Sequence, residues 1–407
     1  MEEWKEYKLR EIGRIVGGAT PPTKDSANYD GDISWITPKD LSNFTGRYIQ
    51  KGERSITQKG FESSSCQILP KGSILFSSRA PIGYIAIAAN ELCTNQGFKS
   101  IIPDNNLVNN LFLYYLLKYN KEEIEGLGSG TTFKEVSAKV MQNFDIKIPS
   151  IQTQKKIADI LSSLDDKIEL NRRINDNLEQ QAQALFKSWF VDFDPFKDGK
   201  FVESELGRIP EGWRVERLGS VCKCLLGGTP SRNKEEYWNG KIAWINSGEI
   251  NEFRITKPSE YITQEGLKKS ATKLLPKKTT VLAITGATLG QVSLLEIDSC
   301  ANQSVIGLLE NEDIFHEYIY PLIKNRIDDL CSHMTGGAQQ HINKNNVEQL
   351  EILVPPKKIL VEYKQIATPI YSLISNICFE SQKISKLRDS LLPRLMSGEL
   401  KLDKINN

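Results

Sequence analysis

The stretch Tyr29-Asp30-Gly31-Asp32-Ile33-Ser34-Trp35-Ile36 returns in the second half of the chain as Trp238-Asn239-Gly240-Lys241-Ile242-Ala243-Trp244-Ile245. The likeness extends upstream, where Gly18-Ala19-Thr20-Pro21 matches Gly227-Gly228-Thr229-Pro230. Further upstream, Trp4 and Leu9 match Trp213 and Leu218. Each pair is 209 residues apart. One constant offset over about 40 residues indicates an internal duplication.

The duplication continues downstream with a small shift in offset. At 207 residues, Leu75 pairs with Leu282, and Cys93-Thr94-Asn95-Gln96 pairs with Cys300-Ala301-Asn302-Gln303. The offset returns to 209 at Ile157-Ala158 and Ile366-Ala367. We therefore predict that each half holds one globular unit followed by one further element.

The globular units are predicted to mix strands and helices. Residues 74–76 and 84–89 are short apolar runs beside Gly and Pro, as in strands, whereas residues 111–118 form an apolar run typical of a helix. The interleaving is too irregular for a doubly wound sheet. We predict an α+β fold with four successive segments: globular units at 1–150 and 201–357, and helical segments at 151–200 and 358–407.

A heptad pattern follows each globular unit. The first seam consists of Ile157, Leu161, Leu164, Ile168, Asn171, Asn175, Leu178, Ala182, Leu185 and Trp189. The second consists of Ile366, Ile370, Leu373, Ile377, Glu380, Ile384, Leu387 and Leu391. Alternating steps of three and four residues are the period of a coiled coil. A helix over 154–190 would be about 55 Å long at ~1.5 Å per residue.

The two apolar stripes need a partner, and we predict that they pack against each other as a long antiparallel coiled coil. Such a spacer would separate the globular units by more than one turn of B-DNA, like half-sites about 34–36 Å apart. Asn171, Asn175 and Glu380 interrupt the stripes. Buried polar seam residues fix register at a cost in stability, and the alternative is that the seam widens there and these groups are solvated.

The composition limits the class of protein but does not by itself indicate a function. The chain has 407 residues, 39 % of them hydrophobic and 25 % charged, with a net charge of +1. Any DNA-binding field must therefore come from charges sorted onto one face. The polar N-terminus lacks the apolar stretch of a signal peptide, no run is long enough to cross a bilayer, and seven cysteines show no dense spacing. These features predict a cytoplasmic protein with reduced thiols and no membrane partner.

Several motifs resemble the specificity subunits of type I restriction–modification enzymes. Gly228-Thr229-Pro230-Ser231 and Tyr237-Trp238-Asn239-Gly240 resemble the opening of a target-recognition domain. Residues 156–168 and 182–196 resemble the central conserved region, and residues 387–400 resemble the C-terminal one. The segments before the two helices depart from the family's Pro-rich pattern with its Glu-Gln pair, which leaves the details of subunit docking open.

The resemblance implies a subunit without an active site, made of two pseudo-symmetric target-recognition domains separated by the two helices. Each domain would read one half of a bipartite, asymmetric site in double-stranded DNA. The helices would set the spacer and recruit two modification subunits, which methylate adenine with S-adenosylmethionine. Restriction subunits, ATP-dependent translocases and nucleases that need Mg²⁺, would then join. No cofactor is expected in this chain.

Two other functions are alternatives for a chain of this kind. One is a coiled-coil scaffold that binds proteins without reading DNA. The other is a self-sufficient methyltransferase, but no P-loop or S-adenosylmethionine motif is present. Asp194-Pro195-Phe196 is better explained as the stop of a long helix. Neither Cys222-Lys223-Cys224 nor any of His316, His333 and His341 has metal-ligand spacing, so we predict no metal site and no catalytic residue.

Candidate DNA contacts come from loops and basic runs. Ser78 and Arg79 follow a strand; Arg79 could contact guanine or phosphate, or form an ion pair, and its counterpart in the alignment is Gly286. A basic run and two matching loops complete the predicted set: Lys268, Lys269, Lys273, Lys277 and Lys278; Gln339, Gln340 and His341; and Thr131, Thr132 and Lys134. The lysines could equally form a solvated face. Trp35 and Trp244 are expected in the core. The Asn-Gln pairs at 95–96 and 302–303 fit structural hydrogen bonds as well as DNA contacts.

Overall fold

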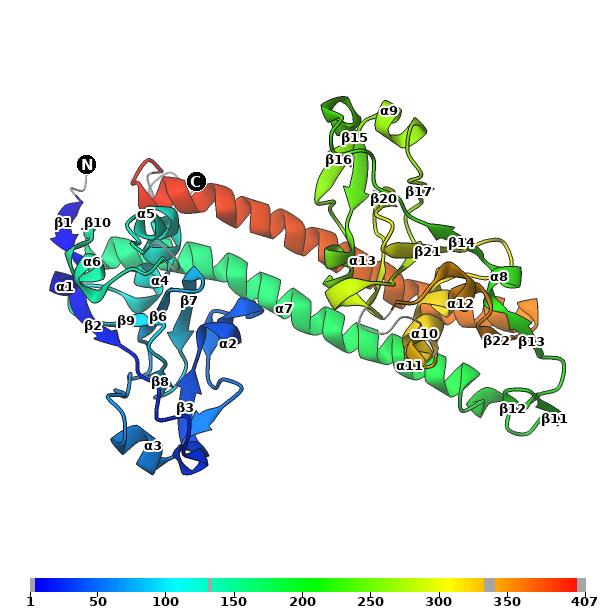
Figure 1. Cartoon of the computed structure of the whole chain (residues 1–407), viewed down its shortest axis with the longest axis horizontal. Coiled ribbons are helices and arrows are strands. Elements are labelled where there is room, and N and C mark those ends of the chain that lie inside the picture. Colours follow the sequence, from blue (N-terminus) through cyan, green and yellow to red (C-terminus); the bar gives the residue numbers. More distant parts are fainter. Residues whose placement is uncertain (1–3, 131–133, 333–340, 401–407) are drawn as a thin grey trace. The chain divides into compact units, whose positions relative to one another are not determined.

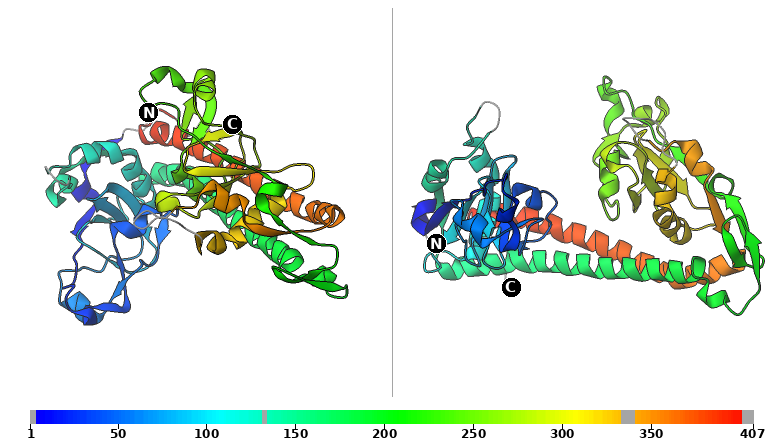
Figure 2. Two further views of the ribbon diagram at one scale, coloured as in Figure 1. Left: turned by 45° about the vertical axis from the view of Figure 1, so that its right-hand side comes forward. Right: turned by 60° about the horizontal axis from the view of Figure 1, so that its bottom comes forward.

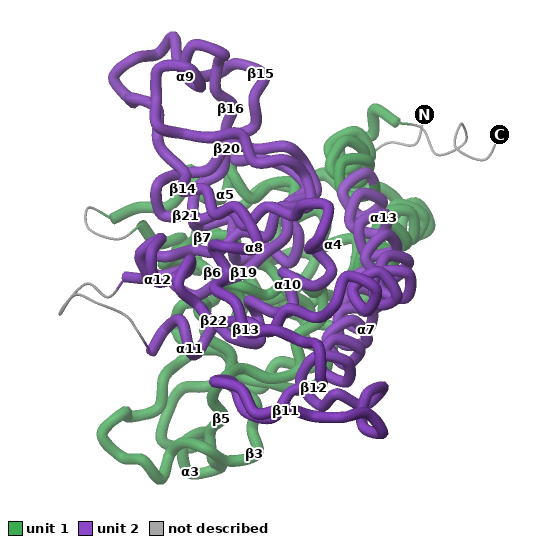
Figure 3. The backbone as a smooth tube through the Cα atoms, turned by 90° about the vertical axis from the view of Figure 1, so that its right-hand side faces the viewer, with its two compact units in different colours: residues 1–169, 384–407 green, residues 170–383 purple. Residues whose placement is uncertain are grey.

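The computed structural model describes residues 4–130, 134–332 and 341–400. It divides into two compact units (Figure 3). Unit 1 comprises residues 1–169 and 384–407, and unit 2 comprises residues 170–383. Two 40-residue helices, α7 (Ile151–Phe190) and α13 (Lys357–Met396), each contribute to both units. Each unit therefore contains one globular half of the sequence and a section of each long helix.

Unit 1 is built on a five-stranded sheet of order β2-β9-β6-β7-β4. Helices α4 and α5 lie against β7, with α4 also touching β6 (Figure 1). A smaller sheet of order β5-β3-β8 forms a lobe that Figure 1 shows at the end of unit 1 away from α7. The strands are β1 (Lys5–Lys8), β2 (Gly13–Gly17), β3 (Tyr29–Ile36), β4 (Tyr48–Ile49), β5 (Ser55–Ile56), β6 (Ile74–Ser78), β7 (Ile82–Ala88), β8 (Cys93–Thr94), β9 (Lys99–Pro103) and β10 (Asp145–Ile148). The helices are α1 (Leu9–Ile12), η1 (Ser26–Asn28), α2 (Pro38–Ser42), α3 (Gln58–Glu62), α4 (Asn110–Tyr119), α5 (Lys121–Gly126) and α6 (Ala138–Asn143).

Unit 2 repeats this plan. Its main sheet has the order β14-β21-β18-β19, and its lobe is a sheet of order β16-β15-β20-β17. The strands are β11 (Phe201–Ser204), β12 (Gly207–Pro210), β13 (Arg214–Arg217), β14 (Lys223–Leu226), β15 (Trp238–Ile245), β16 (Glu260–Ile262), β17 (Leu274–Leu275), β18 (Thr280–Ala283), β19 (Val292–Leu294), β20 (Ser299–Ala301), β21 (Val305–Leu309) and β22 (Glu351–Val354). The helices are η2 (Asp194–Phe196), α8 (Leu218–Val221), η3 (Glu235–Tyr237), η4 (Ser247–Asn251), α9 (Gln264–Lys268), η5 (Gly286–Thr288), α10 (His316–Asn325), α11 (Ile327–Ser332) and α12 (Lys344–Glu348).

In each globular half an early strand pairs with the last strand. β1 runs antiparallel to β10, with Lys5 opposite Ile148. β13 runs antiparallel to β22 in the same way, with Arg214 opposite Val354. The last strand of each half therefore lies beside an early strand of the same half, and the long helix begins directly after it.

The cores of both units join the globular half to the long helices. In unit 1, the α4 core includes Ile157 and Leu161 of α7 together with Leu395 of α13. In unit 2, Phe186 and Phe190 of α7 pack with Tyr318 of α10, at ring-centroid distances of 5.6 and 4.8 Å. Burial of aromatic and aliphatic side chains at these junctions is the main favourable term that attaches each globular half to the helices.

The two long helices pair antiparallel within each unit (Figure 2). In unit 1, Arg388 of α13 donates to Asp165 of α7 at 2.6 Å. In unit 2, the start of α13 meets the end of α7, where the rings of Trp189 and Tyr363 are 5.7 Å apart. The predicted α+β fold with an antiparallel two-helix coiled coil is confirmed.

Candidate nucleic-acid interface

The end of β6 in unit 1 meets a tight turn and a loop. Ser78 is buried; its backbone N–H donates to Gly97 O at 2.7 Å and its Oγ to the same oxygen at 3.1 Å. The predicted contact of Ser78 with DNA is therefore corrected, because its hydroxyl is enclosed and used to hold the turn. Arg79, the next residue, is partly exposed beside Glu135, with 3.8 Å between guanidinium and carboxylate.

The loop before α6 completes this site. Ser129 and Glu135 form a backbone bridge, and the Val136 N–H donates to Ser78 O at 2.9 Å. Lys134 is exposed and directly precedes Glu135, which also bridges to Arg79. The structure thus brings Arg79 and Lys134 together at one end of the sheet. Thr131 and Thr132 lie outside the described residues.

Unit 2 has the same arrangement at equivalent positions. Ile284 N–H donates to Ser304 O at 2.9 Å, as Ser78 does to Gly97, and Ile342 N–H donates to Ile284 O at 3.0 Å, as Val136 does to Ser78. His341 is exposed beside this anchor. The residues that follow the two loops are therefore anchored alike in both units, with His341 in the place of Glu135. Gln339 and Gln340 lie outside the described residues.

These hydrogen bonds correct the sequence alignment in one strand. Ser78 and Ile284 are 206 residues apart, and Leu75 in β6 takes the place of Val281 in β18, each inside a buried apolar cluster of its unit. The pairing of Leu75 with Leu282 was one residue out, because leucine stands at both of these positions and the chain returns to an offset of 207 directly after the strand, at Gly83 and Gly290. Arg79 then corresponds to Thr285, and still has no arginine counterpart.

The predicted lysine run divides into two groups. Lys268, Lys269, Lys273 and Lys277 are exposed in and after α9. Lys278 instead donates to the buried Glu296 at 2.5 Å. Its placement in a DNA-facing patch is therefore corrected: its charge is already balanced inside unit 2.

A turn held by a buried tryptophan recurs in both units. In unit 1, the Trp35 indole donates to Ala19 O at 3.0 Å, and the Ala19 N–H donates to Thr94 O at 3.0 Å. In unit 2, the Trp244 indole donates to Gly228 O at 3.1 Å, and the Gly228 N–H donates to Ala301 O at 2.8 Å. Both tryptophans are buried. They serve as scaffold, as the sequence predicted, and are not available for stacking on bases.

The seam of α7 is largely as predicted, whereas that of α13 is displaced. Ile157 and Leu161 are buried, and Leu164, Ile168, Leu178 and Leu185 are partly buried. In α13, Ile377 is buried and Ile370, Ile384 and Leu391 are partly buried. Ile366, Leu373 and Leu387 are 48 %, 46 % and 49 % exposed, so their assignment to the seam was wrong.

The displacement in α13 has a physical cause. This helix packs on the globular core of unit 2 as well as on α7. Its buried face is therefore the one that lies between α7 and that core. Tyr363 donates to the backbone of α10, and Ala367, Tyr371 and Ile374 are buried in unit 2. The buried positions 367 and 374 each follow a predicted seam position by one residue.

Polar residues near the centre of the helix pair are buried. Asn171 and Asn175 are 1 % and 5 % exposed, which rules out the solvated alternative for both. Asn171 Nδ2 donates to Glu380 Oε2 at 2.7 Å, and Asn175 Nδ2 donates to Cys378 Sγ at 3.3 Å. Asn171 and Glu380 are related by the repeat offset of 209. Two equivalent helices that pair antiparallel meet at equivalent residues in this way.

A buried ionic cluster in unit 2 was not predicted. The fully buried Arg254 donates to Glu179 of α7 at 2.9 Å, and Lys324 of α10 donates to the same carboxylate at 2.9 Å. Burial alone would raise the pKa of Glu179, but Arg254 and Lys324 outweigh it and lower that pKa to about 2. The carboxylate of Glu296 accepts a hydrogen bond from the Ser375 hydroxyl of α13 at 2.7 Å. The cluster ties the loop before β16 to both helices.

One histidine lies between two glutamates in unit 2. His316 Nδ1 is 2.8 Å from Glu310 Oε2 and 3.3 Å from Glu317 Oε2, and Thr368 donates to the other oxygen of Glu317 at 2.6 Å. These three ligand-type residues are close enough to share a cation. The His316 ring is already hydrogen-bonded to Glu310, and Glu317 to Thr368, so the arrangement holds together without an ion.

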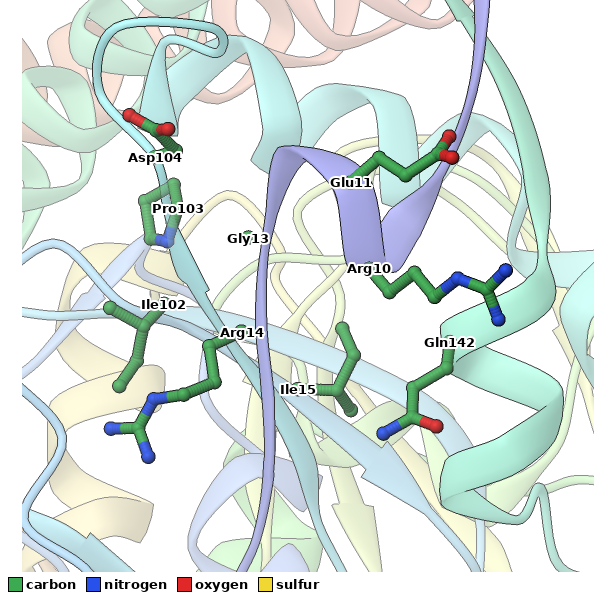
Figure 4. Close-up of a pocket in the computed structure, with 9 residues that line it drawn as sticks. All are labelled: Arg10, Glu11, Gly13, Arg14, Ile15, Ile102, Pro103, Asp104 and Gln142. Carbon is green, nitrogen blue, oxygen red and sulfur yellow. The ribbon is translucent and has the colours of Figure 1, made fainter.

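A surface pocket lies between β2 and the end of β9 in unit 1 (Figure 4). Arg10 and Arg14 line it, but their guanidinium groups donate to Asn143 and Gln67 at 2.6 and 3.1 Å. The backbone of Gly13 forms its floor, where an added Cβ would lie 2.6 Å from Ile102 O. None of the predicted DNA contacts lines it, and its arginines are already engaged.

The fold and the repeated site define a class of protein: a chain with two copies of one α+β domain, each followed by a long helix of an antiparallel pair. The sequence matches the type I restriction modification DNA specificity domain over residues 1–180 and 210–389. The chain belongs to this family. No helix among the described residues is long and apolar enough to span a membrane.

Relatives match along nearly the whole chain. The chain is 36 % identical to the type I restriction enzyme MjaIX specificity subunit of Methanocaldococcus jannaschii, covering 99 % of this chain and 95 % of that one. It is 27 % identical to the HindI specificity subunit of Haemophilus influenzae, covering 98 % and 100 %. The crystal structure of the S subunit of a type I system from M. genitalium has the same fold, with a TM-score of 0.60 at 15 % identity, covering 97 % and 96 %.

Proposed function

We propose that this chain is the DNA-reading specificity subunit of a type I restriction–modification enzyme. Each unit reads one half of a bipartite site in double-stranded DNA. The observation that carries the proposal is that one chain holds two DNA specificity domains whose strand-end sites share a backbone framework and differ in side chains. Arg79 and Lys134 occupy the site in unit 1, whereas unit 2 presents Thr285 and His341. Different side chains on one framework favour two different half-sites.

The long helices set the spacing and recruit the partners. Four apolar side chains that α13 leaves exposed support a role in docking, because their burial against a partner would be favourable: Val361, Ile366, Leu373 and Leu387. The partners are two modification subunits, which supply S-adenosylmethionine and methylate adenine, and restriction subunits, which use ATP and Mg²⁺. The chain itself is non-catalytic and acts on double-stranded DNA in the cytoplasm.

Selection from a randomised duplex pool tests this proposal. The full chain, alone and with its two modification subunits, should enrich one asymmetric motif of two short blocks at a fixed distance. Binding should weaken steeply with salt, because contacts between cationic side chains and phosphates release counterions. A coiled-coil scaffold without DNA reading would enrich no motif and show no salt-dependent duplex binding, and that result would overturn the proposal.

A further inference from the structure

Each unit presents an exposed glutamine that a threonine holds. In unit 1, the Thr20 hydroxyl donates to Gln96 Oε1. In unit 2, the Thr229 hydroxyl donates to Gln303 Oε1 at 2.5 Å. Both glutamines are exposed. Equivalent residues therefore form the same threonine–glutamine pair in both halves of the duplicated sequence.

Close backbone contacts and asparagine hydrogen bonds hold the chain beside each threonine–glutamine pair. An added Cβ at Gly18 would lie 2.0 Å from Asn95 O, and one at Gly227 would lie 2.1 Å from Asn302 O, so no side chain fits there. The Asn95 side chain accepts from Gly97 N at 2.9 Å, and that of Asn302 accepts from Ser304 N at 3.0 Å. The asparagines therefore shape the turn, and the glutamines that follow them are left to face outward.

The direction of the threonine hydrogen bond decides what each glutamine offers. The hydroxyl takes one of the two lone pairs of the amide oxygen and fixes the orientation of the amide, and the Nε2 group is left to donate. A base contact would be expected to differ between two domains that read different half-sites. A donor that recurs in both units instead suits an acceptor that every DNA sequence carries, and the phosphodiester oxygen is that acceptor.

We propose that Gln96 and Gln303 each donate a hydrogen bond to a phosphate of the DNA backbone and so position the two units on the duplex. This inference rests on the proposed function. In unit 1 the glutamine is directly beside the strand-end site, because Gly97 is the residue that Ser78 binds. The phosphate contact then places Arg79 at the adjacent bases. Thr20 and Thr229 are positioning residues.

The test uses the full chain and a labelled 60-bp duplex of randomised sequence, with affinity measured by fluorescence anisotropy at several salt concentrations. The variants are Gln96→Glu with Gln303→Glu, and Gln96→Lys with Gln303→Lys. Gln181→Glu and Gln181→Lys are matched controls, because Gln181 is an exposed glutamine on α7 that bonds only to its neighbour Asn177 among the described residues. Thermal unfolding of each variant checks that folding is unchanged.

The double glutamate variant should raise Kd about a hundredfold, as expected for two lost hydrogen bonds to charged groups. The motif selected from the random pool should not change. The double lysine variant should bind at least as tightly as the unmodified chain, and its salt slope should steepen by about two, because two cations have been added at phosphates.

Two results would overturn the inference while leaving the proposed function intact. One is a double glutamate variant that binds as well as the Gln181→Glu control. The other is a changed motif in the lysine variant, which would place the glutamines at bases. If the unmodified chain binds no duplex at any salt concentration, the proposed function itself fails, and this inference fails with it.

Discussion

Glu179 is the residue whose loss should most affect unit 2. It lies on α7 with only 11 % of its side chain exposed, and it accepts hydrogen bonds from Arg254, Lys324 and Tyr320 at 2.9, 2.9 and 3.0 Å. Glu179→Gln removes the negative charge and keeps the shape. Arg254, whose side chain is fully buried, then loses its nearest anion.

The magnitude follows from the pKa of Glu179. A fall from 4.5 to about 2 corresponds to about 3 kcal/mol of preference for the charged form in the folded state. Breaking a buried ion pair by removing one partner typically costs ~3–5 kcal/mol. We therefore expect Glu179→Gln to lower the free energy of unfolding by about 3 kcal/mol at pH 7.

Unit 1 supplies a matched comparison. Arg47 pairs with Asp166 of α7, but the Asp166 side chain is 67 % exposed. Asp166→Asn should cost less than about 1 kcal/mol, because water screens the exposed Asp166 carboxylate. Urea unfolding followed by tryptophan emission measures both variants. A Glu179→Gln protein that loses no more stability than Asp166→Asn would refute the reasoning.

The ion pair between Glu179 and Arg254 also predicts how the stability of the protein depends on pH. Because the folded-state pKa of Glu179 is lowered, its contribution is present above its unfolded pKa near 4.5 and is lost as the pH falls toward about 2. The difference in stability between the unmodified protein and Glu179→Gln should therefore shrink over that range. A difference that stays constant between pH 7 and pH 3 would contradict the assignment.

Three further outcomes are expected. Asn171→Leu should change the register of the helix pair or the oligomeric state seen by light scattering; an unchanged and more stable protein would show that Asn171 has no register role. Lys268→Ala with Lys269→Ala should reduce the salt slope of DNA binding by about two, whereas Lys278→Ala should lower stability and leave that slope unaltered. The pure chain should not methylate DNA when incubated with S-adenosylmethionine, and methylation without a partner subunit would show that it is an enzyme.

The candidate site was only partly predictable from the sequence. The loops before Val136 and Ile342 could be matched to within one residue, because repeat alignment transfers position from one half to the other. Ser78 and Lys278 were misassigned, because a one-dimensional pattern does not show which hydroxyl or ammonium group is enclosed. The glutamine pairs were visible as a repeat, but the threonine hydrogen bonds that orient them join residues 76 and 74 positions apart.

The amino-acid sequence by itself determined the number of domains, their common fold and the presence of two long helices. These properties follow from local periodicity and from the internal repeat, and both can be recognised in the sequence alone. Only the tertiary structure decided which face of α13 is buried and that Arg254 and Glu179 meet. The reason is that a helix packed on two neighbours buries the face between them, and a buried charge finds its partner through the fold and not along the chain.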